Sequence, residues 1–151
     1  MASIDRDVLL VLHRSTGGAK WKRKWDTDAD ISQWHGVKVN AQGRVVELYL
    51  NDNNLQGPIP SELGKLGALQ ELVLWGNKLS GPIPPELGKL PALVYLYLFG
   101  IQLSGTIPRD PRNLTALQKL GLHSQNLLTG PIRRRSETLQ HYGCSNFSST
   151  S

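Results

Sequence analysis

The feature that most constrains this chain is a pattern of apolar residues that recurs every 24 residues. Each unit carries three apolar positions within six residues, then a further leucine, a glycine and an isoleucine. The equivalent positions are Val45, Leu69, Leu93 and Leu117; Leu48, Leu72, Leu96 and Leu120; Leu50, Leu74, Leu98 and Leu122; Leu55, Leu79 and Leu103; Gly57, Gly81 and Gly105; Ile59, Ile83 and Ile107. Self-similarity of this period is typical of a solenoid, in which each unit stacks on the next.

The spacing also predicts the local structure of each unit. Two leucines separated by one residue, as at Leu48 and Leu50, lie on one face of an extended strand. One strand cannot bury that face, but strands stacked about 4.8 Å apart form a parallel sheet with a continuous leucine core. The Gly-Pro-Ile-Pro elements at 57–60 and 81–84 exclude regular helix. We therefore expect an extended return, followed by short helical turns such as one near 63–66.

Asparagines follow the first two strands, where the chain must turn. We interpret Asn53 and Asn77 as inward-pointing amides that bond backbone groups of adjacent coils, rather than as exposed turn residues. Ile101 takes this position in the third unit and cannot make these bonds. The fourth unit is one residue longer here, and Asn126 could recover the role through a bulge.

The run 69–90 reads Leu-x-x-Leu-x-Leu-x-x-Asn-x-Leu-Ser-Gly-Pro-Ile-Pro-x-x-Leu-Gly-x-Leu, and it resembles the plant-type leucine-rich repeat at nearly every position. The resemblance covers about residues 45–132, as four units of which the last is irregular. It implies an α/β fold, namely a curved right-handed solenoid or horseshoe whose parallel sheet lines the concave side. It also implies a role in recognising proteins, peptides or glycans.

Residues 1–44 are interpreted as a helical cap on the first coil. A helix that begins near Ser3 and ends before Gly17 is predicted by apolar residues at helical spacing, namely Ile4, Val8, Val11 and Leu12. Three tryptophans follow in an otherwise polar stretch. We expect them to cover the leucine edge of the first coil, as solenoid ends require: Trp21, Trp25 and Trp34.

This N-terminal segment resembles two kinds of cap. The run 34–37 with 43–45 is similar to the plant-type cap, whereas 16–18 with Trp21 is more similar to the caps of algal and protist leucine-rich-repeat proteins. Plant-type caps usually carry a cysteine pair here, and the resemblance places Ser32 and Val39 at those positions. We therefore expect a cap without a disulfide, which fits either a reducing compartment or a lineage that has lost the bridge.

The remaining signals bear on the compartment. The acidic N-terminus, with only a short apolar run at 8–12, is unlike a signal peptide. Cys144 is the one cysteine, so no intrachain disulfide can form. No stretch approaches the ~18 apolar residues that a membrane helix needs. We expect a cytoplasmic protein as the sequence is written, or an extracellular one if a leader precedes it, in which case the sequons at Asn113 and Asn146 become relevant.

The C-terminal part departs from the repeat. The expected proline after Ile132 is Arg133, and residues 133–151 are polar and without periodicity. We expect a disordered tail, with at most a helical turn near Leu139. Because nothing caps the fourth coil, it should fray, which favours either a fragment of a longer repeat protein or an imperfect gene model.

Strand alternation predicts which residues line the concave face. Tyr95, Tyr97 and Phe99 lie on one strand beside Trp75 on the preceding one. Exposed aromatic residues are enriched in binding hot spots, although cross-strand aromatic pairs also stabilise a sheet without any partner. The full set of predicted partner-binding residues is Tyr49, Glu71, Val73, Trp75, Tyr95, Tyr97, Phe99, Lys119 and His123.

Two of these positions keep alternative interpretations. Glu47 and Glu71 are like charges on adjacent strands, which favours either a basic partner or a solvated pair. His123 is either a pH-sensitive contact or an ordinary surface histidine. A second copy of the chain, in a homodimer, is an alternative occupant of the same face.

Other motifs predict no chemistry. The run 26–30 imitates a calcium loop, but Ile31 and Val37 occupy the positions that need glycine and glutamate. His141 and Cys144 are close in sequence, yet nothing orients them. The basic and aromatic run 20–25 is interpreted as buried tryptophans with solvated lysines, so nucleic acid is not an expected partner. We predict no cofactor, no metal and no catalytic residue.

The main functional hypothesis is a non-enzymatic recognition module. Its concave aromatic face would bind a protein, peptide or glycan, with the immune or receptor-type signalling role that the resemblance implies. The alternative is a fragment of a larger leucine-rich-repeat receptor or receptor kinase with a mainly structural or regulatory role.

Overall fold

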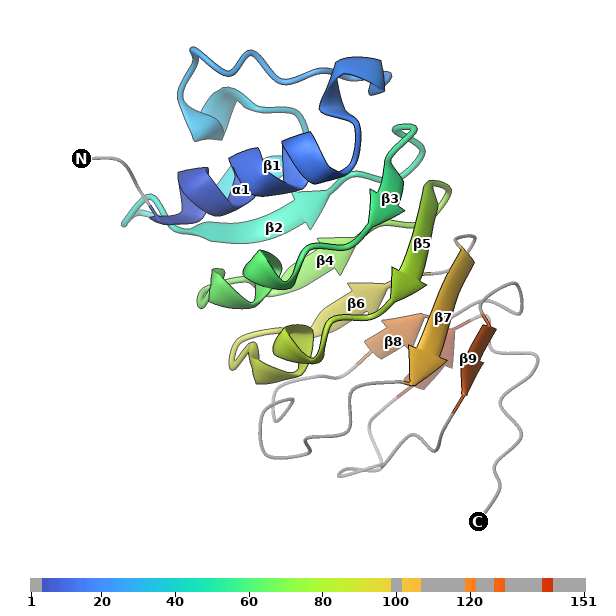
Figure 1. Ribbon diagram of the computed structural model, residues 1–151. Coiled ribbons are helices and arrows are strands. Elements are labelled where there is room, and N and C mark those ends of the chain that lie inside the picture. Colours follow the sequence, from blue (N-terminus) through green and yellow to red (C-terminus); the bar gives the residue numbers. More distant parts are fainter. Residues whose placement is uncertain (1–3, 99–101, 107–118, 122–126, 130–139, 143–151) are drawn as a thin grey trace.

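The computed structural model describes residues 4–98, 102–106, 119–121, 127–129 and 140–142 (Figure 1). The chain begins with helix α1 (Ile4–Ser15) and two short 3-10 helices, η1 (Gly18–Lys20) and η2 (Ile31–Gln33). The described residues then form two sheets that run along the stack (Figure 1). Ile101 and Asn126 lie outside the described residues.

The larger sheet has six strands in the order β1-β2-β4-β6-β8-β10. Its bounds are β1 Val37–Val39, β2 Val45–Tyr49, β4 Glu71–Val73, β6 Tyr95–Tyr97, β8 Lys119–Gly121 and β10 Gln140–Tyr142. β1 is antiparallel to β2, and every later pair is parallel. In register, Leu48 lies level with Leu72, Leu96 and Leu120. This confirms the parallel sheet that the 24-residue columns predict.

The return segments form a second sheet, which the sequence does not predict. Its strands are β3 (Gln56–Pro58), β5 (Lys78–Pro82), β7 (Gln102–Thr106) and β9 (Leu127–Thr129), all parallel. An extended return was expected, but its pairing from coil to coil was not. Two 3-10 helices follow as predicted, η3 (Ser61–Lys65) and η4 (Pro85–Lys89).

The leucine columns form one buried core between the two sheets. Leu48, Leu50, Leu72 and Leu74 have no exposed surface, and each such side chain stabilises the fold by about 2 kcal/mol. Neighbouring coils approach closely on the helical side. A Cβ atom at Gly64 would lie 2.6 Å from Cβ of Glu86 in the next coil, so a larger residue would force the coils apart.

A buried asparagine joins the turns of successive coils. Oδ1 of Asn77 accepts hydrogen bonds from the backbone N–H groups of Asn53 (2.9 Å) and Leu55 (3.1 Å). Its Nδ2 donates to the carbonyls of Leu50 (2.8 Å) and Leu74 (2.9 Å). The carboxamide therefore satisfies backbone groups of two coils at once, where a turn would otherwise bury them unpaired.

Replacing Asn77 with alanine should lower the free energy of unfolding by about 3 kcal/mol, because several buried backbone groups lose their partner together. Urea denaturation followed by circular dichroism measures this. The matched control is Asn51→Ala, at a half-buried asparagine of the preceding turn, and we expect little change there. Equal midpoints for the two variants would contradict the role of Asn77.

Helix α1 and the tryptophans pack on the first coil. Val8, Leu9 and Leu12 are buried, as are Trp21, Trp25 and Trp34. The helix ends where Thr16 donates from both its N–H and its Oγ1 to the Leu12 carbonyl, and Gly17 follows in the left-handed conformation. Figure 1 shows α1 lying across the end of the stack.

The predicted face of α1 is partly wrong. Ile4 is 66% exposed and Val11 is half-buried, whereas Leu9 is completely buried. Ile4 is the first residue of the helix. The residue that completes the buried face is Asp5.

Asp5 is a buried carboxylate that the sequence interpretation missed. It has no exposed surface and accepts hydrogen bonds from Arg44 Nε (2.9 Å), Arg44 Nη2 (3.1 Å) and the backbone N–H of Val45 (2.8 Å). The bonds and charge of Asp5 raise the pKa of Arg44. Since Val45 begins β2, this carboxylate fixes α1 to the first strand of the stack.

We expect Asp5→Asn to lower the free energy of unfolding by about 2 kcal/mol, because an amide cannot pair with Arg44 and satisfies fewer donors. Asp7→Asn, at an exposed position of the same helix, is the control and should be nearly neutral. Thermal and urea unfolding compare the two. A neutral Asp5→Asn variant would show that apolar packing alone holds α1.

The tail contains a strand where disorder was expected. β10 pairs in parallel with β8, so that Gln140 lies opposite Lys119 and His141 opposite Leu120. The prediction is therefore wrong for residues 140–142. The strand was missed because it follows β8 after a shorter interval than the repeat and brings His141 to the leucine column. An open sheet edge favours pairing whatever the side chains are. Leu139 lies outside the described residues.

Candidate partner-binding face

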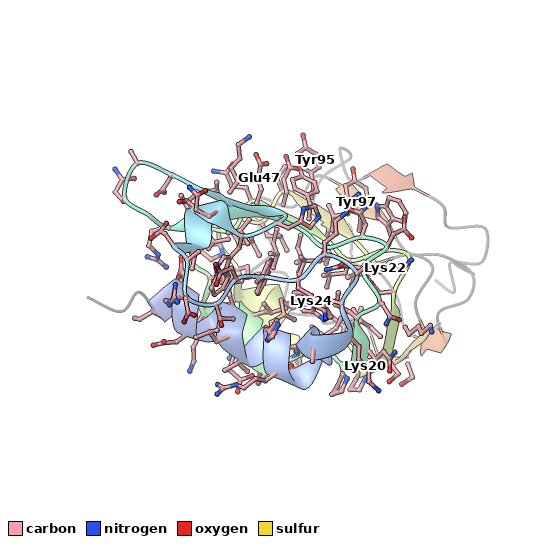
Figure 2. All side chains as sticks on the ribbon, turned by 90° about the horizontal axis from the view of Figure 1, so that it is seen from above. Lys20, Lys22, Lys24, Glu47, Tyr95 and Tyr97 are labelled. Carbon is pink, nitrogen blue, oxygen red and sulfur yellow. The ribbon has the colours of Figure 1, made fainter. Side chains whose placement is uncertain are left out.

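The residues between the buried leucines form the outward face of the six-stranded sheet. One row across the strands is Glu47, Glu71, Tyr95 and Lys119; the next is Tyr49, Val73, Tyr97 and Gly121. Figure 2 shows Glu47, Tyr95 and Tyr97 projecting from the same side of the sheet. We call the part that carries Tyr49, Trp75, Tyr95 and Tyr97 the aromatic face.

The rings of the aromatic face are supported but accessible. Tyr95 and Tyr97 lie two residues apart on β6, and their rings stack with centroids 6.4 Å apart and planes 6° apart. Both are half-buried, as are Tyr49 and Trp75. Ordered rings with open surface lose little conformational entropy when a partner covers them.

Val73 is a correction to the predicted partner-binding set. It occupies the expected row, between Tyr49 and Tyr97, but only 4% of it is exposed. A short β-branched side chain between two longer aromatic ones is covered by them. Val73 therefore supports the aromatic face from below and presents almost no surface to a partner.

The acidic end of the same face is internally paired. Lys38 Nζ on β1 lies 3.5 Å from Glu47 Oε2, and the Tyr49 hydroxyl donates to Glu71 Oε2. Glu47 and Glu71 are opposite each other in register. Burial, and then repulsion by Glu47, raises the pKa of Glu71, while Lys38 opposes the shift. Lys38 was missed because the antiparallel strand β1 was not predicted.

Not every predicted site residue can be placed. Phe99 and His123 lie outside the described residues, and Lys119 is placed by its register opposite Tyr95. Asn53 and Asn77 lie in the turns behind the sheet and are buried, so they do not belong to the surface. The strand register thus brings Tyr49, Glu71, Tyr95 and Tyr97 together on one face. Trp75 follows β4, and strand alternation assigns it to the same face.

The described residues contain no group of side chains typical of a metal site. Among them, no three histidine, cysteine, aspartate or glutamate side chains are grouped so as to hold a metal ion. Nor does the described part include a helix of the length and apolarity required to cross a bilayer. What the face offers is aromatic contact area beside a paired acidic patch.

Comparisons with known proteins agree with this architecture. The family model for the leucine-rich repeat matches residues 44–66 and 68–90. The chain is similar to the ectodomain of BIR2 from Arabidopsis thaliana, with 36% identity and a TM-score of 0.72 over 85% of this chain and 70% of that one. The comparison with curated proteins finds no significant match. The chain belongs to the leucine-rich-repeat family, and its repeats are of the plant type.

Two further structures from Arabidopsis thaliana are similar. In the BIR3–SERK2 complex the match has 33% identity and a TM-score of 0.69, over 83% of this chain and 70% of that one. The ectodomain of the receptor kinase GASSHO1/SCHENGEN3, in complex with CASPARIAN STRIP INTEGRITY FACTOR 2, matches at 29% identity and a TM-score of 0.76. That match covers 91% of this chain and 17% of the longer one.

Glu71 makes a testable contribution to pH dependence. Because its pKa is raised on folding, the folded chain binds more protons, and the free energy of unfolding falls as pH rises from the ordinary glutamate value, about 4.3, through the raised one. Glu71→Gln should therefore be more stable relative to wild type at pH 7 than at pH 3.5. Urea titrations at both pH values measure this. Parallel pH profiles for the two proteins would contradict it.

Proposed function

We propose that this chain is a non-enzymatic recognition module that binds a protein or peptide on the aromatic face. The observation that carries the proposal is the group of half-exposed rings, Trp75, Tyr95 and Tyr97, on a sheet whose other side is the leucine core. The leucine core is complete without these rings, so packing of the core does not explain why aromatic residues occupy the outer face. Tryptophan and tyrosine are the residues that most often anchor protein interfaces.

The relatives support a partner of this class. The BIR3 structure contains SERK2, and the GASSHO1/SCHENGEN3 ectodomain is in complex with CASPARIAN STRIP INTEGRITY FACTOR 2. A further similar structure is PEPR1 with AtPEP1, at 27% identity and a TM-score of 0.69. Complexes with other polypeptides recur among these neighbours, so a polypeptide ligand is a better candidate than a glycan.

The domain organisation is part of the same proposal. Residues 1–44 act as the N-terminal cap, residues 45–132 form a right-handed repeat stack, and residues 133–151 follow it as a tail that includes β10. The tryptophans and the Asp5–Arg44 pair support the capping role, because they close the first coil with buried apolar surface and a directional bond. Partner binding by the aromatic face is compatible with a place in a longer receptor.

The test is a double substitution, Trp75→Ala with Tyr97→Ala. Peptides selected from a random library on the wild-type chain should bind the double variant at least ~10-fold more weakly, because two hot-spot rings are lost. Fluorescence anisotropy with a labelled selected peptide measures the affinity. Far-UV circular dichroism checks that the variant is folded.

A control variant and a second measurement keep the test sharp. Lys65→Ala with Lys89→Ala removes two exposed side chains from the helical turns and should leave peptide binding unchanged. Unchanged affinity of the aromatic variant would refute the proposal. Sedimentation equilibrium addresses self-association: a wild-type dimer that dissociates on the aromatic substitution would assign this face to a second copy of the chain instead.

A further inference from the structure

A strip of positive charge lies beside the aromatic face. Lys20, Lys22, Arg23 and Lys24 are all exposed, while the tryptophans at 21 and 25 are buried. We call residues 20–24 the basic segment. Figure 2, which views this end of the stack, shows Lys20, Lys22 and Lys24 on the strip of chain that crosses it.

The basic segment is held rigidly by the turn of the first coil. Asn53 Oδ1 accepts from the Arg23 N–H (2.6 Å), and Asn53 Nδ2 donates to the Arg23 carbonyl (3.3 Å). The Lys22 N–H donates to the Asn53 carbonyl (3.2 Å), and Asn54 Nδ2 donates to the Lys20 carbonyl (2.9 Å). The Asn53 carboxamide thus bonds backbone groups of the basic segment, just as the Asn77 carboxamide bonds backbone groups of the first coil. The cations stand on a fixed backbone, which lowers the entropy cost of binding.

The charge of the basic segment is not neutralised within the described part of the chain. No carboxylate there forms an ion pair with any of its four cations. The nearest acidic residue in sequence is Asp26, whose Oδ1 accepts from the Asp28 N–H (3.0 Å). Arg23 Nη1 lies 3.3 Å from His35 Nε2. Burial and the charge of Arg23 lower the pKa of His35, and an imidazole ring carries no negative charge that could compensate the guanidinium.

The composition of the segment narrows the class of partner. Trp21 within the segment and Trp25 directly after it are buried, and their Nε1 groups donate to the carbonyls of Thr16 and His35, respectively. Within residues 20–24 no exposed ring is present to stack on bases, as single-stranded nucleic acids require. The same five residues expose no apolar side chain that could enter a membrane. Recognition by charge on a fixed backbone fits an acidic polypeptide segment.

The position of the segment connects it to the aromatic face. Lys22 bonds the Asn53 carbonyl in the first turn, and the Asp52 N–H in that turn donates to the Trp75 carbonyl (3.0 Å) in the next. Two steps of about 4.8 Å place the basic segment about 10 Å from Trp75. An extended peptide covers this distance in about three residues.

We propose that the basic segment binds an aspartate- or glutamate-rich stretch of the same polypeptide that occupies the aromatic face. The linkage of the two surfaces rests on the proposed function, whereas the acidic preference of the segment stands independently. Such a partner carries an apolar or aromatic anchor followed, about three residues away, by clustered carboxylates.

The first experiment tests the segment alone, with a fluorescein-labelled oligoglutamate peptide and the full chain. Lys22→Gln with Lys24→Gln should weaken binding about tenfold and flatten its salt dependence. Lys65→Gln with Lys89→Gln removes the same charge elsewhere and should change the affinity less than about twofold. Equal losses in the two variants, or none in either, would overturn the proposal.

Further arms separate this inference from the proposed function. The Trp75→Ala, Tyr97→Ala variant should bind oligoglutamate as well as wild type does, even if the aromatic face has no partner. A library-selected peptide extended by a glutamate tail should bind wild type more tightly than the same peptide without the tail. On the Lys22→Gln, Lys24→Gln variant the tailed and untailed peptides should bind equally. Tighter binding to dextran sulfate or to phosphatidylserine vesicles than to oligoglutamate at equal salt would overturn the choice of a polypeptide.

Discussion

The carboxamides at the coil turns are the interaction on which the rest of the structure depends. A parallel stack pairs its strands through their backbones, but each turn leaves buried N–H and carbonyl groups that no strand can reach. Asn77 satisfies such groups in its own coil and in the preceding one. Asn53 does the same for Arg23. One chemical device therefore fixes the spacing of the coils and the position of the basic segment.

The N-terminal end shows why apolar burial alone does not place an element. Three buried tryptophans pack over the first coil together with the apolar residues of α1, and such contacts are non-directional. Direction comes from Asp5, which binds Arg44 and the first N–H of β2. An apolar residue at this position would bury similar area without fixing where α1 lies along the strand.

The features that the sequence predicts differ in physical origin from the features that it does not predict. The leucine columns define the faces of the strands, because successive side chains of an extended chain point to opposite sides of the sheet. The asparagine positions follow from the 24-residue period, because Asn53 and Asn77 occupy the same place in successive units. Asp5 was missed although a charge within the apolar set Val8, Leu9 and Leu12 is a readable signal. The burial of Val73 depends on the size of its neighbours across the sheet, which periodicity does not encode.

The pairing of the return segments and of β10 also escapes the sequence. Both are backbone interactions, and every residue except proline offers the same backbone N–H and carbonyl groups. The extended return at Gln56–Pro58 was expected, yet its register with Lys78–Ser80 arises only when the coils stack. In β10 the leucine column is interrupted by His141, so the strand is defined by the open edge of β8 and by no side-chain pattern.

The outer face of the sheet has an acidic end and an aromatic end, which contribute differently to binding. At one end Lys38 pairs with Glu47 and the Tyr49 hydroxyl donates to Glu71, so both carboxylates already have a partner within the chain. At the other end, rings remain half-exposed although the leucine core is complete without them. Apolar area supplies affinity, whereas charge mainly increases the association rate and selects the partner. An aromatic surface flanked by a rigid basic segment combines both, which is why the two are best understood as one recognition surface.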